Sequence, residues 1–305
     1  KAHDPAYGAA VSHAAEALDA AIPADEVAKI DAFLREQARL PLDARYSAGE
    51  PWGARQEHLL GKPLASGLDF AVDADDDCWD ELARGVALSE SNLREVPNGV
   101  AVSTLWTDRV TANAAAHGAT WVHALILAVA LLDRGDRDAA AMQIDQSLSK
   151  RPSWLGYRLK ALLSPDVDAA SSNYLRAWDA GDAPAELAVE IATHFMKEGR
   201  SGELKRFVDA LPPAVRDNER IILARALVAA NDGQFDELER LLMSRQFASI
   251  REGETLLSDL WVKLRRGRLE TELNRAATPE EIRQDLALHP LPRSLDLRMH
   301  VLEES

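Results

Sequence analysis

Cysteine is nearly missing from this sequence: Cys78 is the only one among 305 residues. A single cysteine excludes an internal disulfide and fits a reducing compartment. No apolar run approaches the roughly 20 residues that a membrane-spanning helix needs. The residues after Lys1 also lack the apolar core of a signal peptide. We therefore predict a cytoplasmic protein with no membrane partner.

Positive charge is also scarce. The chain has 35 Lys and Arg against 50 Asp and Glu, which leaves a net charge of −15. Such a surface repels phosphate backbones and anionic lipids, so we predict no nucleic-acid partner. Alternating apolar and polar residues of useful length are absent too, which disfavours β-strands. With 47% hydrophobic and 28% charged residues, the composition predicts an all-α globular fold.

The motifs of common catalytic and metal sites are missing as well. There is no HExxH pair, no Gly-x-Ser-x-Gly elbow and no phosphate-binding loop. The acidic run at residues 73–77 fails as a calcium loop because Cys78 and Arg84 occupy the positions that need Gly and Glu. Those aspartates should also raise the pKa of the Cys78 thiol. We predict no catalytic, cofactor or metal residues, and whether the protein is an enzyme stays open.

What the sequence does contain is helical periodicity, most clearly at residues 121–152. Apolar residues recur at three- and four-residue spacing in 121–133 and again in 137–149, which predicts two helices, each with an apolar face and a wet side. Gly135 can close the first helix in the left-handed conformation, and Asp136 can cap the second. Pro152 then ends it.

This helix pair fits the 34-residue tetratricopeptide pattern. With Gly135 as anchor, the signature positions hold Leu127, Ala128, Leu131, Ala140, Ile144, Ser147 and Pro152. Glycines recur at 199 and 233, which are 34 residues apart. We therefore predict a tetratricopeptide-like helical-hairpin solenoid with an irregular N-terminal wrapping segment, and the alternative is an ordinary antiparallel helix pair. Its buried residues should include Leu127, Leu131, Ile144, Ile191, Phe195 and Leu242.

The punctuation by Pro and Gly suggests four segments. Residues 1–41 form an N-terminal helical hairpin, 42–118 an irregular wrap with short helices, 119–250 the tetratricopeptide-like helix pairs, and 251–305 capping helices with a tail. Basic residues cluster at Lys263, Arg265, Arg266 and Arg268. We interpret this cluster as the solvent-exposed face of a capping helix rather than as a phosphate site.

Several local phrases go beyond generic repeats. They are GEPWGARQE (49–57), PLASGLDF (63–70), REGETLLSDLW (251–261) and PLPRSLDLRM (290–299). Together with the central helix pairs, they resemble the C-terminal region of large bacterial tetratricopeptide-repeat proteins. In those proteins a galactose-mutarotase-like domain of uncharacterised function lies upstream. The resemblance implies a bacterial protein associated with carbohydrate, and it transfers no catalytic residue.

The function predicted from these patterns is a scaffold or protein-interaction region within a larger carbohydrate-associated protein. Two alternatives stay open: a contribution to a glycan-processing active site with an upstream domain, and a free-standing peptide-binding adaptor. The expected partner is a protein or an upstream domain of the same polypeptide, with carbohydrate as a further candidate. The candidate interaction residues are Trp52, Glu57, Arg251, Glu252, Glu254, Asp259 and Trp261.

Overall fold

The computed structural model describes residues 77–99, 101–247, 250 and 255–296, together with Ala32, residues 47–48 and 69–70, Arg55 and Leu59. This part is helical apart from β1 (Ser47–Ala48) and β2 (Asp69–Phe70), two short strands that pair in parallel. The predicted all-α fold class is confirmed. The predicted hairpin at 1–41 and most of the predicted wrap up to residue 76 lie outside the described residues. The chain divides into two compact units, Lys1–Asp182 and Ala183–Ser305.

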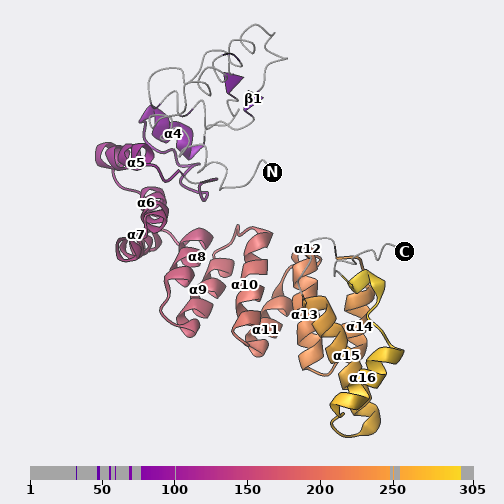
Figure 1. Cartoon of the computed structure of the whole chain (residues 1–305). Helices are drawn as coiled ribbons and strands as arrows, with labels where there is room; N and C mark the ends of the chain where they lie inside the picture. Colours follow the sequence, from indigo (N-terminus) through magenta and orange to yellow (C-terminus); the bar gives the residue numbers. More distant parts are fainter. Residues whose placement is uncertain are drawn as a thin grey trace. The chain divides into compact units, whose positions relative to one another are not determined.

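The first unit is a series of helices (Figure 1). They are α4 (Cys78–Arg84), α5 (Thr104–His117), α6 (Trp121–Asp133), α7 (Arg137–Lys150), α8 (Trp154–Leu163) and α9 (Val167–Asp179). Helices α6 and α7 pack together, as do α8 and α9. At the α4–α5 contact the buried rings of Trp79 and Trp106 meet edge to face, with centroids 5.4 Å apart. This is the arrangement that aromatic quadrupoles favour.

Helix α6 is more enclosed than its periodicity predicts. Val122, Leu125 and Ile126 point in different directions around the helix by their spacing, yet all three are buried, because α5 packs on α6 in addition to α7. Leu127 and Leu131, which we predicted to be buried, are only half-buried. A helix covered on several sides needs apolar residues all round, so its face cannot be read from spacing alone.

The turn between α6 and α7 confirms the prediction for Gly135, whose φ is +81°. The Asp136 N–H donates to the Leu131 carbonyl at 2.9 Å, which completes a Schellman motif. The Asp136 carboxylate then accepts a backbone hydrogen bond in the first turn of α7. Gly199 and Gly233 also have positive φ and close helices with the same hydrogen bonding. The glycine spacing therefore reports real helix ends.

The second unit is also built from helices (Figure 1). Its elements are α10 (Ala185–Lys197), α11 (Ser201–Ala210), α12 (Pro213–Arg216), α13 (Glu219–Asn231), α14 (Phe235–Met243), α15 (Leu256–Leu273), α16 (Pro279–Leu288) and the 3-10 helix η2 (Arg293–Leu295). The apolar faces of α13, α14 and α15 meet in one core, which Leu295 also joins. The predicted burial of Ile191, Phe195 and Leu242 is confirmed, as is that of Ile144 in the first unit.

Candidate partner-binding groove

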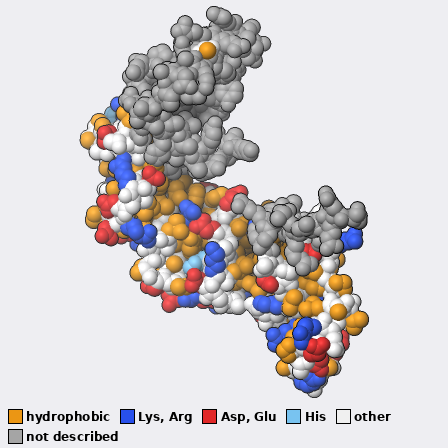
Figure 2. Space-filling model, viewed as in Figure 1, with side chains coloured by type: hydrophobic (Ala, Val, Ile, Leu, Met, Phe, Trp, Pro, Cys, Tyr) orange, Lys and Arg blue, Asp and Glu red, His pale blue; other side chains and the backbone are white. Residues whose placement is uncertain are grey.

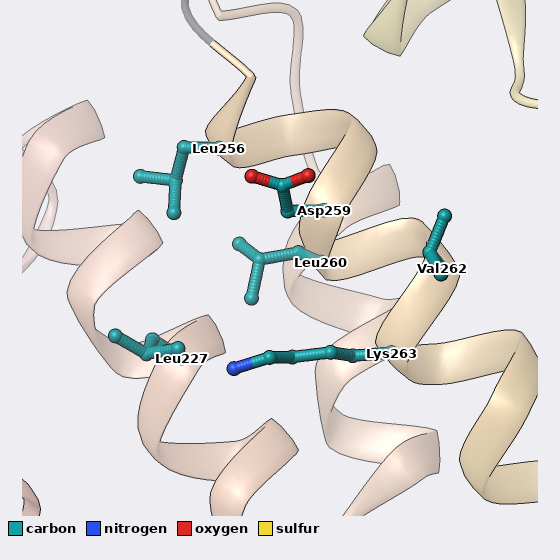
Figure 3. Close-up of a pocket in the computed structure, with 6 residues that line it drawn as sticks. All are labelled: Leu227, Leu256, Asp259, Leu260, Val262 and Lys263. Carbon is teal, nitrogen blue, oxygen red and sulfur yellow. The ribbon is translucent and has the colours of Figure 1, made fainter.

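A groove of about 420 Å³ lies between α13 and α15 in the second unit. Leu227 lines it from α13, and the α15 side consists of Leu256, Asp259, Leu260, Val262 and Lys263. Figure 3 shows Leu256 and Leu260 pointing across the groove towards α13, with the Lys263 side chain extending towards Leu227. Aliphatic side chains therefore form the floor, and one acidic and one basic group stand beside them.

Helix α15 can form this groove because it has an apolar stripe in the core and, beside it, a stripe of two leucines and a lysine. Leu257, Leu260, Trp261 and Leu264 follow the three- and four-residue spacing of a helix face and are buried in the core. Leu256, Leu260 and Lys263 make the neighbouring stripe, which is turned towards Leu227. At the start of the helix, the Thr255 hydroxyl donates to the Asp259 carboxylate at 2.8 Å. Asp259 is therefore already partnered within its own helix.

The basic cluster on α15 is largely neutralised by carboxylates. Arg265 pairs with Asp285, Arg266 with Glu270, and Arg268 with both Asp236 and Glu239. Figure 2 shows acidic and basic side chains interleaved over α15 and α16. Lys263 is the exception, since it forms no ion pair with another described residue. The interpretation as an exposed helix face fits Arg266, whereas Lys263 belongs to the groove.

A separate polar contact holds α16 against α15. The Arg265 guanidinium donates to both carboxylate oxygens of Asp285 at 2.9 and 2.7 Å. Hydrogen bonding from Arg265 lowers the pKa of Asp285. The indole N–H of Trp261 donates to the carbonyl of His289 at 3.2 Å, just beyond α16. Because α16 has no fully buried residue, these polar contacts carry much of its attachment.

Of the predicted interaction residues, the structure describes two. Asp259 lines the groove, and Trp261, which is 8% exposed, packs in the adjacent core. The other five lie outside the described residues: Trp52, Glu57, Arg251, Glu252 and Glu254. Sequence reasoning missed Leu227, Leu256, Leu260, Val262 and Lys263. The signal that could have found the α15 part is the helical spacing of Leu256, Leu260 and Lys263, beside the stripe that enters the core.

In the first unit, two carboxylates share one buried arginine. Arg55 donates to both oxygens of Asp80 and lies 2.9 Å from Asp77, which also caps α4. Burial raises the pKa of Asp77 to about 6. Burial opposes ionisation of Asp80 as well, but hydrogen bonds from Arg55 lower the pKa of Asp80 overall. Burial, more than the neighbouring aspartates, raises the pKa of Cys78, so the predicted direction is confirmed.

His123 is a buried histidine with a defined structural role. Its Nδ1 accepts from the Thr120 backbone N–H at 3.1 Å, which leaves Nε2 to donate to Asn113 Oδ1, also at 3.1 Å. Asn113 in turn donates to the Val86 carbonyl at 2.8 Å. Burial and the nearby charge of Lys150 lower the pKa of His123 to about 4. The neutral ring therefore ties α6 to α5 and to the segment after α4.

Neither a membrane-spanning helix nor a cluster of metal ligands is found among the described residues. None of their helices combines the length and apolar character needed to cross a membrane. Their His, Cys, Asp and Glu side chains do not gather into groups of three that could hold a metal ion.

The second unit is where this chain resembles known proteins. Residues 184–279 match a family model described as the N-terminal SD domain of the transcriptional regulator SIX1. The human (Homo sapiens) homeobox protein SIX5 is 33% identical over 115 residues, covering 37% of this chain and 15% of that protein. Its mouse (Mus musculus) counterpart is 32% identical over 115 residues, covering 37% and 16%. The matched part thus spans about 15% of the length of these relatives, and no solved structure is significantly similar to the chain.

This similarity corrects the family resemblance that we predicted from the sequence. The resemblance to bacterial proteins with a galactose-mutarotase-like domain is wrong, because the matches are a transcriptional-regulator domain and mammalian homeobox proteins. One phrase that suggested it, residues 251–261, lies inside the matched segment 184–279. Short phrases of Gly, Trp and periodic leucines fix too few positions, so they recur in unrelated helical proteins. Assignment to the tetratricopeptide-repeat class is corrected for the same reason.

The predicted functions and partners are corrected with it. The carbohydrate-associated scaffold, the contribution to a glycan-processing site and the free-standing adaptor are all overturned by the match to a transcriptional regulator. Carbohydrate loses its support as a partner, and the exclusion of nucleic acid is wrong for this class. The net charge of −15 is too coarse to support that exclusion, because it sums the whole chain, whereas DNA recognition in general depends on local patches.

Proposed function

We propose that the Ala183–Ser305 unit is a partner-binding domain of a regulator of transcription. The observation that carries this proposal is the place where the family match begins. The matched segment starts at residue 184, one residue after the start of the second compact unit, and it covers α10 to α15 and ends at residue 279, where α16 begins. A match that begins at the start of a folded unit favours a shared domain over a chance run of periodic residues.

The groove between α13 and α15 lies wholly inside this segment. An apolar groove between two helices, bordered by a few polar groups, suits the binding of a protein segment better than catalysis on a small substrate. We therefore assign the partner-binding role to this groove and place Asp259 at its edge. A regulator of transcription acts in the nucleus and at DNA, directly or through partners. Nucleus thus replaces cytoplasm as the proposed location, in agreement with the single cysteine.

The finer fold, a solenoid of helical hairpins, is part of the proposal within each unit. The Schellman turns at Gly135 in the first unit and at Gly199 and Gly233 in the second support it, because each joins two antiparallel helices in the same way. In a solenoid, the unfolding of one hairpin should depend only weakly on hairpins that are distant from it. Hydrogen exchange that shows one fully cooperative block in each unit would argue against it.

The function is tested by tethering the whole chain to a heterologous DNA-binding domain upstream of a reporter gene in cultured human cells. We expect the tethered chain to change reporter output at least about threefold relative to the DNA-binding domain alone, in either direction. The change should disappear when the promoter lacks the tethering site. Unchanged output from a chain that is expressed, folded and nuclear would overturn the proposal.

A further inference from the structure

We infer that the α13–α15 groove binds helix α15 of a second copy of this chain, in a two-fold symmetric and antiparallel arrangement. This inference rests on the proposed partner-binding role of the groove and deepens it by naming the partner. Three properties of the groove carry it: two opposite charges one helical turn apart, an exposed valine beside them, and aliphatic walls that can cover that valine.

Asp259 and Lys263 are the charged residues in the part of the groove lining that the structure describes. Both are exposed, and the hydrogen bond from the Thr255 hydroxyl leaves the negative charge of Asp259 in place. The two side chains leave α15 one turn apart, and that of Lys263 extends towards Leu227 (Figure 3). Because a charge that is covered without a counter-charge is destabilised, an occupant must present one group of each sign.

The surface of α15 itself meets this requirement. Residues four apart in sequence lie about 6 Å apart along a helix axis. A two-fold axis that passes beside residue 261 therefore places Asp259 of one copy opposite Lys263 of the second copy, and the same pair forms again on the other side of the axis. Two charges that cancel within one surface thus become complementary between two copies of that surface.

The apolar contacts follow from the same symmetry. Val262 is 39% exposed and lies next to the proposed axis, where the two helices would cross. In this arrangement Val262 of each copy lies against the groove of the other, where Leu227 and Leu256 are half-buried. Covering such apolar surface contributes roughly 25 cal/mol for each Å² removed from water. A groove of about 420 Å³ suits a few side chains of one helix.

The strength of this association is limited by size and by net charge. The net charge of −15 on each copy repels the other copy at long range. At physiological ionic strength the Debye length is about 8 Å, so that repulsion is largely screened. An interface centred on one helix from each copy is small, and small interfaces are weak. We therefore expect a reversible dimer that forms as the protein concentration rises.

The test is sedimentation velocity of the purified full chain at physiological ionic strength, over a range of concentrations. We expect the native chain to pass from monomer to dimer. Asp259→Lys and Lys263→Asp each place like charges opposite one another and should weaken dimerisation at least about tenfold. An equimolar mixture of the two variants should recover dimerisation, because the two positive groups of one variant then face the two negative groups of the other.

The control variants carry the same kind of charge change in the first unit. Glu90 and Arg94 form an exposed ion pair between residues four apart, as far in sequence as Asp259 and Lys263. Glu90→Lys and Arg94→Asp, alone or mixed, should dimerise as the native chain does. Circular dichroism of every variant checks that its helices are intact.

Three results would overturn the inference: a native chain that stays monomeric, single variants at 259 and 263 that behave like the controls, and a mixture that dimerises no better than its components. Because dimerisation needs no promoter, its failure is distinguishable from failure of the reporter experiment. A dimer that leaves reporter output unchanged would refute the proposed function alone, and a monomer that changes the output would refute this inference alone.

Discussion

The ring of Phe235 lies directly against Gly267, so that a Cβ on that glycine would stand only 1.9 Å from Phe235 Cζ. This contact joins the start of α14 to the middle of α15. Beside it, Arg268 donates to Asp236 and Glu239, both at 2.8 Å. The missing side chain of Gly267 thus sets how closely α15 approaches α14, and with it one wall of the groove.

We therefore expect Gly267→Ala to destabilise the second unit by about 1–3 kcal/mol through overpacking. In an exposed helix the same change would stabilise by roughly 0.5–1 kcal/mol. Chemical denaturation measures the difference. Gly202→Ala is the matched control, because Gly202 is also helical and nothing lies within 4 Å of its added Cβ. If both variants gain stability alike, the Phe235 contact does not limit the approach of α15.

At the α6–α7 turn, conformation rather than space decides the outcome. A Cβ on Gly135 would meet nothing within 4 Å, yet its φ is +81°. Gly135→Val should therefore cost about 1–2 kcal/mol of unfolding free energy. Gly135→Asn should retain most of the stability, because asparagine tolerates the left-handed region. Equal stability of the Val and Asn variants in urea would show that the turn is not left-handed.

Acid should weaken the first unit through His123. Its pKa is about 4 in the folded chain against 6.5 when unfolded, so protonation favours the unfolded state. The stabilisation is fully present above pH 6.5 and falls by about 3 kcal/mol as the pH drops to 4. Asp77, with its pKa raised to about 6, contributes the opposite slope, since its stabilisation is lost as the pH rises from 3.8 to 6.

The measurement must therefore be a difference between proteins. Urea denaturation from pH 7.5 to 4 is compared for the native chain and His123→Gln. Gln keeps hydrogen-bonding groups but does not titrate, so the stability gap between the two should narrow on acidification. A gap that stays constant across this range would mean that His123 is not held neutral.

The attachment of α16 should depend on the Arg265–Asp285 pair, whose side chains are each 12% exposed. Arg265→Ala removes both guanidinium hydrogen bonds from the Asp285 carboxylate, which keeps only the contact with His289, and should cost about 1–3 kcal/mol. Arg275→Ala removes a more exposed pair with Glu281 and should cost at most about 1 kcal/mol. Hydrogen exchange in α16 reports the loss locally. Equal exchange in the two variants would contradict this assignment.

The helices were predictable from sequence because their ends have local causes. Gly135, Gly199 and Gly233 close helices through backbone hydrogen bonds a few residues away, and Asp136 and Ser103 cap helices in the same local manner. Periodicity also predicted Ile144, Phe195 and Leu242 as buried. The short helix α12 was missed because four residues carry no periodicity, although Pro213 stands at its first turn.

The candidate site was less predictable because it depends on tertiary contacts. Leu227 and Leu256 stand far apart in sequence, and only the packing of α13 against α15 brings them to one groove. The basic residues of α15 look equivalent in sequence, yet Asp285 and Glu239 neutralise two of them and leave Lys263 at the groove. Asp259 was predicted as an interaction residue because it lies in the sequence phrase 251–261. Its place at the groove edge follows instead from the packing of α15 against α13.

The most direct test of the proposed partner-binding role is the tethered reporter with two matched valine variants. Val262 in the groove is 39% exposed, and Val86, far from it in sequence and in the first unit, is 44% exposed. We predict that Val262→Asp returns reporter output to the level of the DNA-binding domain alone, while Val86→Asp retains the activity of the native chain. Equal activity of the two variants, at equal expression and thermal stability, would contradict the assignment of partner binding to the α13–α15 groove.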